Sequence, residues 1–470
     1  MKKKVLLVRL VSEKLNSVGH PRNIRVPFLL KYMESILKRD SIYETLLLDC
    51  MASNMKLEGL IDVSIEYSPD IIVIFTTTLE YGLSLKYAGR VKKKSSPVIV
   101  AVGQDATASA QRYVYNGSPI DFVLRGESEF SLIKLLEVIY GQGDFSHIEG
   151  ISTSHYSHPN LAFVNELEDL PTPIYEENEL EGYRYYFPVS WGKRLVWGHL
   201  LSSRGCPYNC IFCSQTIRES YGKALRLRKP SDVIDEMMYL QTQGANFIVF
   251  ADDNFTTSRN HVIGICEEIR KRRLKIRWTA HARVDNCDED LLKIMKSAGC
   301  SLLRFGIESG SGKIIKILKK TDIENWLDRA REIFIAARKI SLDTAALFLI
   351  GNPSETREDI EKTISFAIEL SPDLVQVAFF TPYPGSPAYE EFKDKISTFD
   401  IEHMYHYSVS SLNFSCISSS ELRKLYKKFY IKNLLSPRFL LNHFYKYSLF
   451  YIHNKETILK LCNIKRLIFN

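Results

Sequence analysis

Three cysteines on one short stretch carry the most recognisable chemistry in this sequence. Cys206, Cys210 and Cys213 follow the pattern C-x3-C-x2-C. Three thiolates at this spacing can hold three irons of a [4Fe-4S] cluster and leave the fourth iron open to another ligand. A structural zinc site would need a further cysteine or histidine close by, but the next ones along the chain are His261 and Cys266. The spacing therefore favours an iron-sulfur cluster over zinc.

The rest of the composition indicates a large globular protein. The other six cysteines are scattered, which argues against a disulfide framework and indicates a reducing cytoplasm. With 470 residues the chain is long enough for two or three domains. No apolar run reaches the ~18 residues of a membrane span. The apolar start, interrupted by Arg9, is predicted to be a buried strand rather than a signal peptide.

Residues 1–142 alternate between short β-branched runs and amphipathic patterns. The runs are predicted to be strands at 4–11, 43–50, 70–76, 97–103 and 122–126. Helices are predicted between them at 26–38, 57–67 and 81–93, from near 107, and at 129–140. Such alternation predicts an α/β domain with a doubly wound, Rossmann-like (flavodoxin-like) parallel sheet. Residues 143–194, with their prolines and acidic run, are predicted to be a linker.

A second alternation begins at residue 195 and predicts another α/β domain. Its six strands are expected at 195–203, 247–251, 276–284, 301–307, 342–350 and 374–381. Six βα units predict a partial (βα)6 barrel of the TIM type over residues 195–400. Functional loops in such barrels lie at the carboxyl ends of the strands.

The cysteine stretch, with aromatic Phe212 before its last cysteine, resembles the cluster loop of the radical S-adenosylmethionine (SAM) superfamily. The resemblance extends over about residues 195–390. It implies a [4Fe-4S] cluster whose open iron binds the amino and carboxylate groups of SAM. In that superfamily, an electron from the cluster cleaves SAM to methionine and a 5′-deoxyadenosyl radical. The electron would come from an external donor of the flavodoxin or ferredoxin type.

The same resemblance assigns residues at the strand ends to SAM. Phe212 belongs to the cluster loop, and Asp253 would accept a hydrogen bond from the SAM amino group. Arg283 would pair with the SAM carboxylate through its planar, permanently charged fork. Glu308 would hold the ribose hydroxyls, and Gly351 would let the backbone approach the adenine.

Each of these residues also has a plainer interpretation. Asp253 and Glu308 could cap the helices that follow them. Arg283 could form a salt bridge with nearby Asp285. Tyr383, in the proline-rich turn after the sixth strand, could face a substrate or fill the barrel mouth. These alternatives stay open at the level of the sequence.

The first domain resembles the cobalamin-binding domain that precedes the barrel in one large radical SAM subgroup. The resemblance rests on two turns, Gly103-Gln104 and Gly126-Glu127, and implies that these residues contact cobalamin. Gln104 stands where a second glycine is common, and no Asp-x-His-x-x-Gly motif supplies a histidine to cobalt. A methylthiotransferase would need three more cluster cysteines here, but only Cys50 is present. The alternative is a flavodoxin-like domain that binds nothing.

Residues 401–470 form a basic, aromatic segment predicted to be helical. Residues 421–470 contain eleven lysines and arginines against two glutamates. The segment could cap the barrel, with its charges solvated. It could instead bind an acidic substrate, a membrane surface or a nucleic acid.

Together these features predict a cytoplasmic, cobalamin-dependent radical SAM enzyme. The resemblance implies methylation of an unactivated carbon of a small molecule, through a 5′-deoxyadenosyl radical and methylcobalamin. One alternative keeps both cofactors but carries out oxidation, cyclisation or ring rearrangement without methyl transfer. Another is a non-catalytic sensor that binds cobalamin or a cluster.

Overall fold

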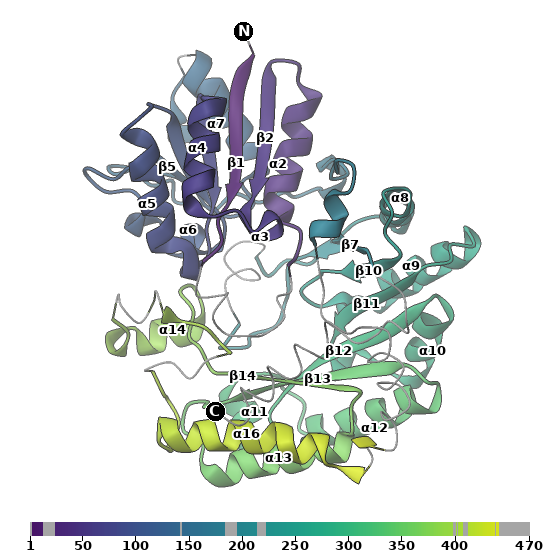
Figure 1. Ribbon diagram of the computed structural model, residues 1–470. Helices are drawn as coiled ribbons and strands as arrows, with labels where there is room; N and C mark the ends of the chain where they lie inside the picture. Colours follow the sequence, from purple (N-terminus) through teal and green to yellow (C-terminus); the bar gives the residue numbers. More distant parts are fainter. Residues whose placement is uncertain are drawn as a thin grey trace.

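The computed structural model describes residues 2–12, 24–141, 143–183, 195–213, 222–397, 401, 403–407, 412–437 and 439–440. These residues form two α/β domains, each built on a six-stranded sheet. In Figure 1 the N-terminal domain, in purple and blue, lies above the second domain, in teal and green.

The N-terminal sheet has the strand order β2-β1-β3-β4-β5-β6. Five strands are parallel, and the sixth is antiparallel to its neighbour: β1 (Lys3–Arg9), β2 (Tyr43–Asp49), β3 (Ile71–Phe75), β4 (Val98–Val102), β5 (Phe122–Leu124) and β6 (Ile151–Ser152). The first five follow the flavodoxin-like order, which switches direction between β1 and β3. The predicted doubly wound sheet is confirmed. However, β6 lies within the segment expected to be a linker and completes the sheet instead.

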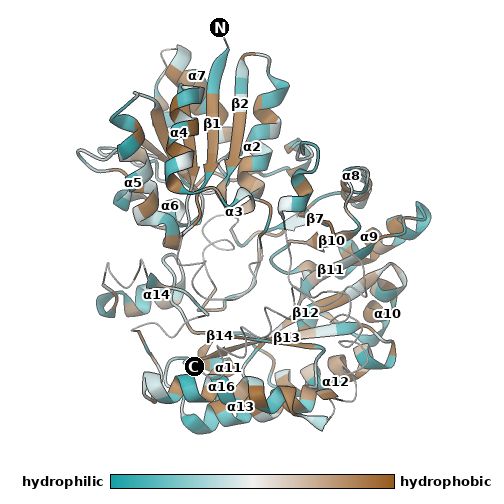
Figure 2. Ribbon diagram, in the orientation of Figure 1, coloured by the Kyte–Doolittle hydropathy of each residue, from teal (hydrophilic) through white to brown (hydrophobic). Residues whose placement is uncertain are grey.

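Helices cover both faces of this sheet because its strands are apolar on both sides. Helices α4 (Leu57–Tyr67) and α5 (Tyr81–Lys92) pack on one face, and α2 (Phe28–Arg39) and α7 (Glu129–Gly141) on the other. Figure 2 shows the central strands in brown and the exposed helix faces in teal. Two short helices, α3 (Cys50–Ser53) and α6 (Gln104–Ala108), follow β2 and β4. Both therefore begin at the carboxyl edge of the sheet, where ligands bind in such folds.

The second sheet is wholly parallel, in the order β14-β13-β12-β11-β10-β7. Its strands are β7 (Trp197–Leu200), β10 (Phe247–Phe250), β11 (Arg277–Ala282), β12 (Cys300–Glu308), β13 (Asp343–Ile350) and β14 (Leu374–Phe379). Its main helices are α8 (Pro230–Thr242), α9 (Arg259–Lys271), α10 (Glu289–Ser297), α12 (Trp326–Lys339) and α13 (Arg357–Leu370), with the short α11 (Gly312–Ile317) before α12. The sequential strand order confirms the predicted partial barrel.

A small hairpin flanks the cysteine stretch. Strand β8 (Ser203–Arg204) precedes the stretch and pairs antiparallel with β9 (Arg226–Leu227), which follows it. The predicted first strand, 195–203, is thus divided between β7 and β8.

Helix α16 (Ser419–Leu434) closes the outer side of the last strands. Leu422, Leu425 and Phe429 are buried in the barrel core, and the ring of Phe429 lies 5.3 Å from that of Phe348 on β13. In Figure 1 this helix lies beside α13 below β13 and β14. Residues 419–434 therefore cap the barrel. The remaining tail, 441–470, lies outside the described residues. In the part of the chain that the structure describes, no helix combines the length and apolar character needed to cross a bilayer.

Candidate functional site

The cysteine loop is anchored to the barrel by backbone hydrogen bonds. The Ile211 N–H donates to the Leu318 carbonyl at 3.0 Å, and the Ile211 carbonyl accepts from the Ala388 N–H at 3.0 Å. Cys206 and Cys210 are buried, while Cys213 is partly exposed. These contacts hold the loop between the α11 turn and the segment after β14.

The three thiols of the loop are suited by their chemistry to bind iron. Among the described residues, no three histidine, cysteine or acidic side chains already converge as a metal site. The thiols are nevertheless close enough to influence one another. Burial raises the pKa of the Cys213 thiol well above its usual value, and the charges of Cys210 and Cys206 add to the shift. To ionise side by side, these three thiols need a cation between them, which is what iron would supply.

Asp252 and Asp253, which follow β10, have different surroundings. Asp252 is engaged by Ser202: its carboxylate accepts from the Ser202 N–H at 3.1 Å and from the Ser202 hydroxyl at 2.8 Å. Asp253 Oδ2 is buried and has no hydrogen-bond partner. Burial, and then the charge of Asp252, raise the pKa of the Asp253 carboxyl to about 8. A buried carboxylate oxygen without a donor suits an ammonium group, so the geometry favours Asp253 over Asp252 as a ligand-binding residue.

Asp253→Asn should stabilise the cluster-free chain by several kcal/mol more at pH 9 than at pH 5. The folded-state pKa of about 8 lies above the ordinary value of 3.8, so folding favours the protonated carboxyl. The stability associated with that proton is fully present below about pH 3.8 and is lost progressively as the pH rises from there to about 8. Denaturant unfolding at pH 5, 7 and 9 checks this. Asp252→Asn is the control and should destabilise the chain, because Asp252 accepts hydrogen bonds from Ser202. An unchanged pH dependence in Asp253→Asn would contradict the assignment.

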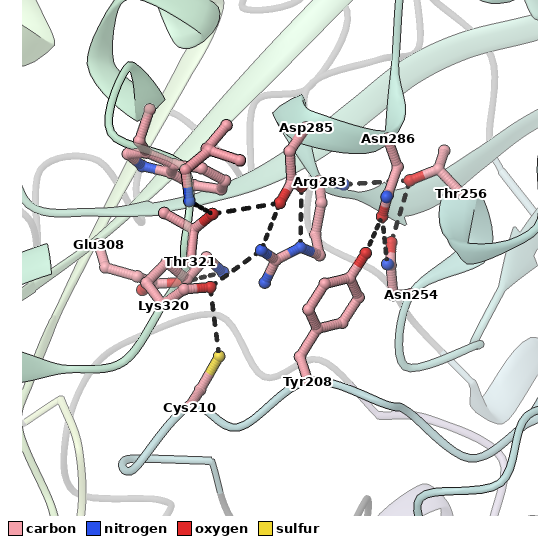
Figure 3. Close-up of polar contacts among 12 residues, drawn as sticks. Tyr208, Cys210, Asn254, Thr256, Arg283, Asp285, Asn286, Glu308, Lys320 and Thr321 are labelled. Atoms are coloured by element: carbon pink, nitrogen blue, oxygen red, sulfur yellow. Dashed lines mark hydrogen bonds and ion pairs between the residues drawn. The ribbon is translucent and has the colours of Figure 1, made fainter. Parts of the chain in front are cut away.

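Arg283, predicted to bind the SAM carboxylate, is committed to Asp285 (Figure 3). Its Nε donates to Asp285 Oδ1 at 2.9 Å and its Nη2 to Asp285 Oδ2 at 2.6 Å. The Nη2 also donates to the Lys320 carbonyl at 2.9 Å, and the guanidinium lies 3.6 Å from the centroid of the Tyr208 ring. The salt bridge left open by the sequence is therefore present. Arg283 braces the loop residue Tyr208 against the α11–α12 connection.

Lys320 is a buried cation that sequence reasoning missed. It is only 7% exposed, and its Nζ donates to Glu308 Oε1 at 2.9 Å. Figure 3 shows the two side chains meeting above Cys210, whose Sγ lies 4.0 Å from the Lys320 carbonyl. Burial works to lower the pKa of the Lys320 ammonium, but the charges of Glu308 and Cys210 outweigh it and raise the pKa. Nothing in the sequence distinguishes Lys320 from its neighbour Lys319, because only the fold buries one of them.

Glu308 ends β12 in an unusual backbone conformation. Its φ of 68° lies in the left-handed region, and the strand register shifts between Gly306 and Glu308. A Cβ on Gly306 would lie 2.4 Å from Glu308 Oε1 and 2.8 Å from Lys320 Nζ. Strain of this kind is concentrated at functional sites. Gly306 thus provides the space in which the Glu308–Lys320 pair forms.

The other predicted SAM contacts lie around the same strand ends. Phe212 packs in a small apolar cluster, with its ring centroid 6.0 Å from Lys320 Nζ. Gly351 has a φ of 78°, and its N–H donates to Glu355 Oε2 at 2.6 Å. The Tyr383 hydroxyl lies 3.0 Å from His406 Nδ1. The roles of these residues toward SAM and substrate stay predictions.

A cavity of about 810 Å³ opens on the other side of the cysteine loop. Its lining includes Tyr208, Arg283, Lys320 and Trp326. Asp253, Glu308 and Gly351 are not part of this lining. Lys320 therefore borders this cavity and also contacts Glu308.

His281, on the inner face of the barrel, is a poor candidate for a general base. It lies opposite Arg304 in the β11–β12 register. Burial lowers the pKa of His281 to about 3, and the charges of Arg25 and Lys320 add to the shift. The imidazole therefore stays neutral at physiological pH. Arg25 belongs to the N-terminal domain, so its charge acts across the domain junction.

The two glycine turns of the N-terminal domain are required by packing. Gly103 has a φ of 103°, and a Cβ there would lie 2.8 Å from the Thr76 carbonyl. Gly126 has a φ of 85°, and a Cβ there would lie 2.3 Å from the Ala162 carbonyl. Gln104 begins α6. The carboxylate of Glu127 is occupied by arginines of the barrel. Contact between these four residues and cobalamin stays a prediction.

Unpaired polar atoms do gather at the carboxyl edge of this sheet. Glu80 Oε1, Asp105 Oδ1, Ser128 Oγ and both terminal nitrogens of Arg112 are buried without a hydrogen-bond partner. They follow β3, β4 and β5, and Glu80 comes after β3, one of the two strands at the direction switch of the sheet. Ligands of doubly wound sheets bind at this edge. A large ligand rich in amide groups, such as cobalamin, would fit these donors and acceptors.

Comparison with known proteins decides the nature of the second domain. Residues 200–367, which include the cysteine loop and the strand ends described above, match the Radical SAM superfamily. This part of the chain is a radical SAM domain. Over 434 residues the chain is 28% identical to an uncharacterized methyltransferase of Pyrococcus horikoshii, and the match covers 91% of each chain.

Two further likenesses extend over both domains. The chain is 26% identical over 431 residues to the anaerobic magnesium-protoporphyrin IX monomethyl ester cyclase of Cereibacter sphaeroides, covering 87% of this chain and 68% of the cyclase. The radical SAM methyltransferase TsrM from Kitasatospora setae was solved with cobalamin and a [4Fe-4S] cluster bound. It matches with a TM-score of 0.70 at 18% identity, covering 84% of this chain and 78% of TsrM. The radical SAM domain and the N-terminal domain thus share the fold of TsrM.

Proposed function

We propose that the protein is a cobalamin-dependent radical SAM enzyme that methylates an unactivated carbon of a small molecule. The observation that carries this proposal is the cysteine loop of the radical SAM domain, with the buried Glu308–Lys320 pair beside Cys210. Support for methyl transfer comes from the methyltransferase of Pyrococcus horikoshii and from the fold of TsrM. When bound, the cluster would supply the electron that cleaves SAM, and cobalamin would carry the methyl group.

Different residues of the radical SAM domain would bind different groups of SAM. Cys206, Cys210 and Cys213 hold the cluster and leave one iron for SAM. Asp253 receives the SAM ammonium, since its Oδ2 is buried without a donor. Lys320, rather than Arg283, would face the SAM carboxylate, because Nε and Nη2 of Arg283 already pair with Asp285. A buried ammonium beside the cluster loop offers that carboxylate a strong partner.

Glu308 has two possible partners at the SAM site. In the free protein it pairs with Lys320. When the SAM carboxylate reaches Lys320, it shares the ammonium with Glu308, whose second oxygen can accept from the ribose hydroxyls. Gly306 leaves space for this exchange because it has no side chain. The N-terminal domain would bind cobalamin through atoms of Glu80, Asp105, Arg112 and Ser128 that are buried without a hydrogen-bond partner.

Product analysis after anaerobic reconstitution tests the proposal. With SAM, cobalamin, a reductant or reduced flavodoxin, and candidate substrates, we expect both S-adenosylhomocysteine and 5′-deoxyadenosine to accumulate. The similarity to a cyclase suggests a second outcome to test for. Formation of 5′-deoxyadenosine without S-adenosylhomocysteine would indicate cyclisation or oxidation in place of methylation. A non-catalytic sensor would form no 5′-deoxyadenosine above the level of the Cys210→Ala variant.

A further inference from the structure

Three buried charged residues and a partly buried arginine join the two domains next to the cysteine loop. Arg204 on β8 donates from Nη1 to Glu127 Oε2 at 3.2 Å and from Nη2 to Glu129 Oε1 at 2.7 Å. Arg226 on β9 donates from Nη1 to Glu127 Oε2 at 2.9 Å, and its Nη2 also pairs with Glu127. The side chains of Glu127 and Glu129 are fully buried, and that of Arg204 is 1% exposed. Two arginines of the barrel are thus neutralised by two glutamates of the N-terminal domain.

The β8–β9 hairpin depends on these glutamates. Arg204 and Arg226 are directly opposite each other in its antiparallel register. Like charges at opposite positions repel and destabilise the pairing of the strands. Glu127 lies between both guanidinium groups, and its Oε2 also accepts from the Val164 N–H at 2.8 Å. The N-terminal domain thus supplies two carboxylates, of Glu127 and Glu129, to the facing arginines of this hairpin.

The residues of this network are close in the chain to the predicted cobalamin turn and to the first cysteine. Glu127 directly follows Gly126, in the turn predicted to contact cobalamin. Arg204 precedes Cys206 by two residues, and the Gly205 between them has a φ of 90°. The Cys206 N–H donates to the Gly222 carbonyl at 3.3 Å, across the same hairpin. One ion pair thus links the predicted cobalamin turn to the first cysteine of the cluster loop.

We infer that Glu127, Glu129, Arg204 and Arg226 are positioning residues that hold the start of the cysteine loop in a fixed place relative to the N-terminal domain. Docking of the N-terminal domain therefore fixes the position of Arg204, two residues before Cys206. The inference rests on the proposed function for what the loop and the turn bind, but the contacts between them belong to the chain itself. Glu127→Gln removes the one carboxylate that pairs with both arginines, and loss of one side of a buried ion pair is destabilising, so we expect the variant to loosen the hairpin.

Amide hydrogen exchange on the full-length, cofactor-free chain tests the inference. In Glu127→Gln we expect amides of residues 203–210 and 222–227 to exchange at least about tenfold faster than in the native chain. Asp49→Asn is the matched control. It breaks the buried Arg9–Asp49 pair inside the N-terminal domain, so it should lower stability without accelerating exchange in the hairpin. If Glu127→Gln does not fold, Glu129→Gln carries the same test, because it neutralises one carboxylate and preserves its shape.

A second measurement separates positioning from simple stability. In chains loaded with Co(II) cobalamin and a reduced cluster, pulsed electron paramagnetic resonance should report a broadened distance between the two centres in Glu129→Gln and an unchanged distance in Asp49→Asn. Native exchange rates in the hairpin of both glutamate variants would overturn the inference, as would equal acceleration by Asp49→Asn. The exchange result does not depend on the cofactors. Failure of the proposed function would instead appear as absence of 5′-deoxyadenosine from the native chain.

Discussion

Cys210→Ala should lower the rate of 5′-deoxyadenosine formation by more than about 100-fold. Loss of a residue that merely supports a metal ligand costs about 10–100-fold in affinity or activity, and Cys210 is proposed as a ligand itself. The variant keeps only two of the three thiolates on the loop, which is too few to hold the cluster with one open iron. Anaerobic reconstitution, iron and sulfide analysis, and quantification of 5′-deoxyadenosine check the result.

The chain contains a suitable control for this substitution. Cys416 is a free, exposed cysteine outside the loop, so Cys416→Ala should retain the iron content and activity of the native protein. Tight zinc binding by the native chain, with no spectral response to SAM, would contradict the cluster assignment. Native iron content in Cys210→Ala would contradict it equally.

Lys320→Met should weaken SAM binding by at least about tenfold and destabilise the protein by about 3–5 kcal/mol. Lys320 Nζ is the ion-pair partner of Glu308, and both side chains are less than 10% exposed. Removing the ammonium leaves the Glu308 carboxylate buried without its counter-charge and takes away the proposed partner of the SAM carboxylate. Anaerobic equilibrium dialysis with SAM and denaturant unfolding measure the two effects.

A double-mutant cycle on Glu308 and Lys320 separates their effect on stability from the effect of Lys320 on SAM binding. Glu308→Gln combined with Lys320→Met should recover part of the stability lost in Lys320→Met, because no uncompensated carboxylate remains. SAM binding should not recover, since the ammonium is still missing. Recovery of both properties would reduce Lys320 to a structural partner of Glu308. If Lys320→Met keeps the native SAM affinity and Arg283→Met loses it, Arg283 rather than Lys320 binds the SAM carboxylate.

Strand positions could be predicted because buried strands reveal themselves locally. The run at 70–76 became β3 (Ile71–Phe75), and the run at 97–103 became β4 (Val98–Val102). Their β-branched, uninterrupted apolar character follows from being covered on both faces. The ends of the runs also located Asp253, Glu308 and Gly351. By contrast, β6 has only two residues and carries no such pattern, so its segment was interpreted as linker.

The roles of charged residues could not be predicted in the same way. The sequence allows Arg283 to pair either with a SAM carboxylate or with Asp285. Only the folded chain shows that it pairs with Asp285. Glu127 belongs to a turn typical of cobalamin-binding domains, yet its carboxylate faces Arg204 and Arg226, about 80 to 100 residues away in the chain. The partners of a charge are set by long-range packing, which no local pattern encodes.

The sequence by itself determined the two α/β domains, the cysteine loop and the strand ends around it, because spacing and hydrophobic periodicity are local properties. Only the tertiary structure decided which charges are buried and with whom they pair: Lys320 with Glu308, and Glu127 and Glu129 with the arginines of the β8–β9 hairpin. The physical reason is that a charge buried by folding must find its counter-charge wherever the chain brings one close. In this protein, that counter-charge comes from the other domain at the position where the cysteine loop begins.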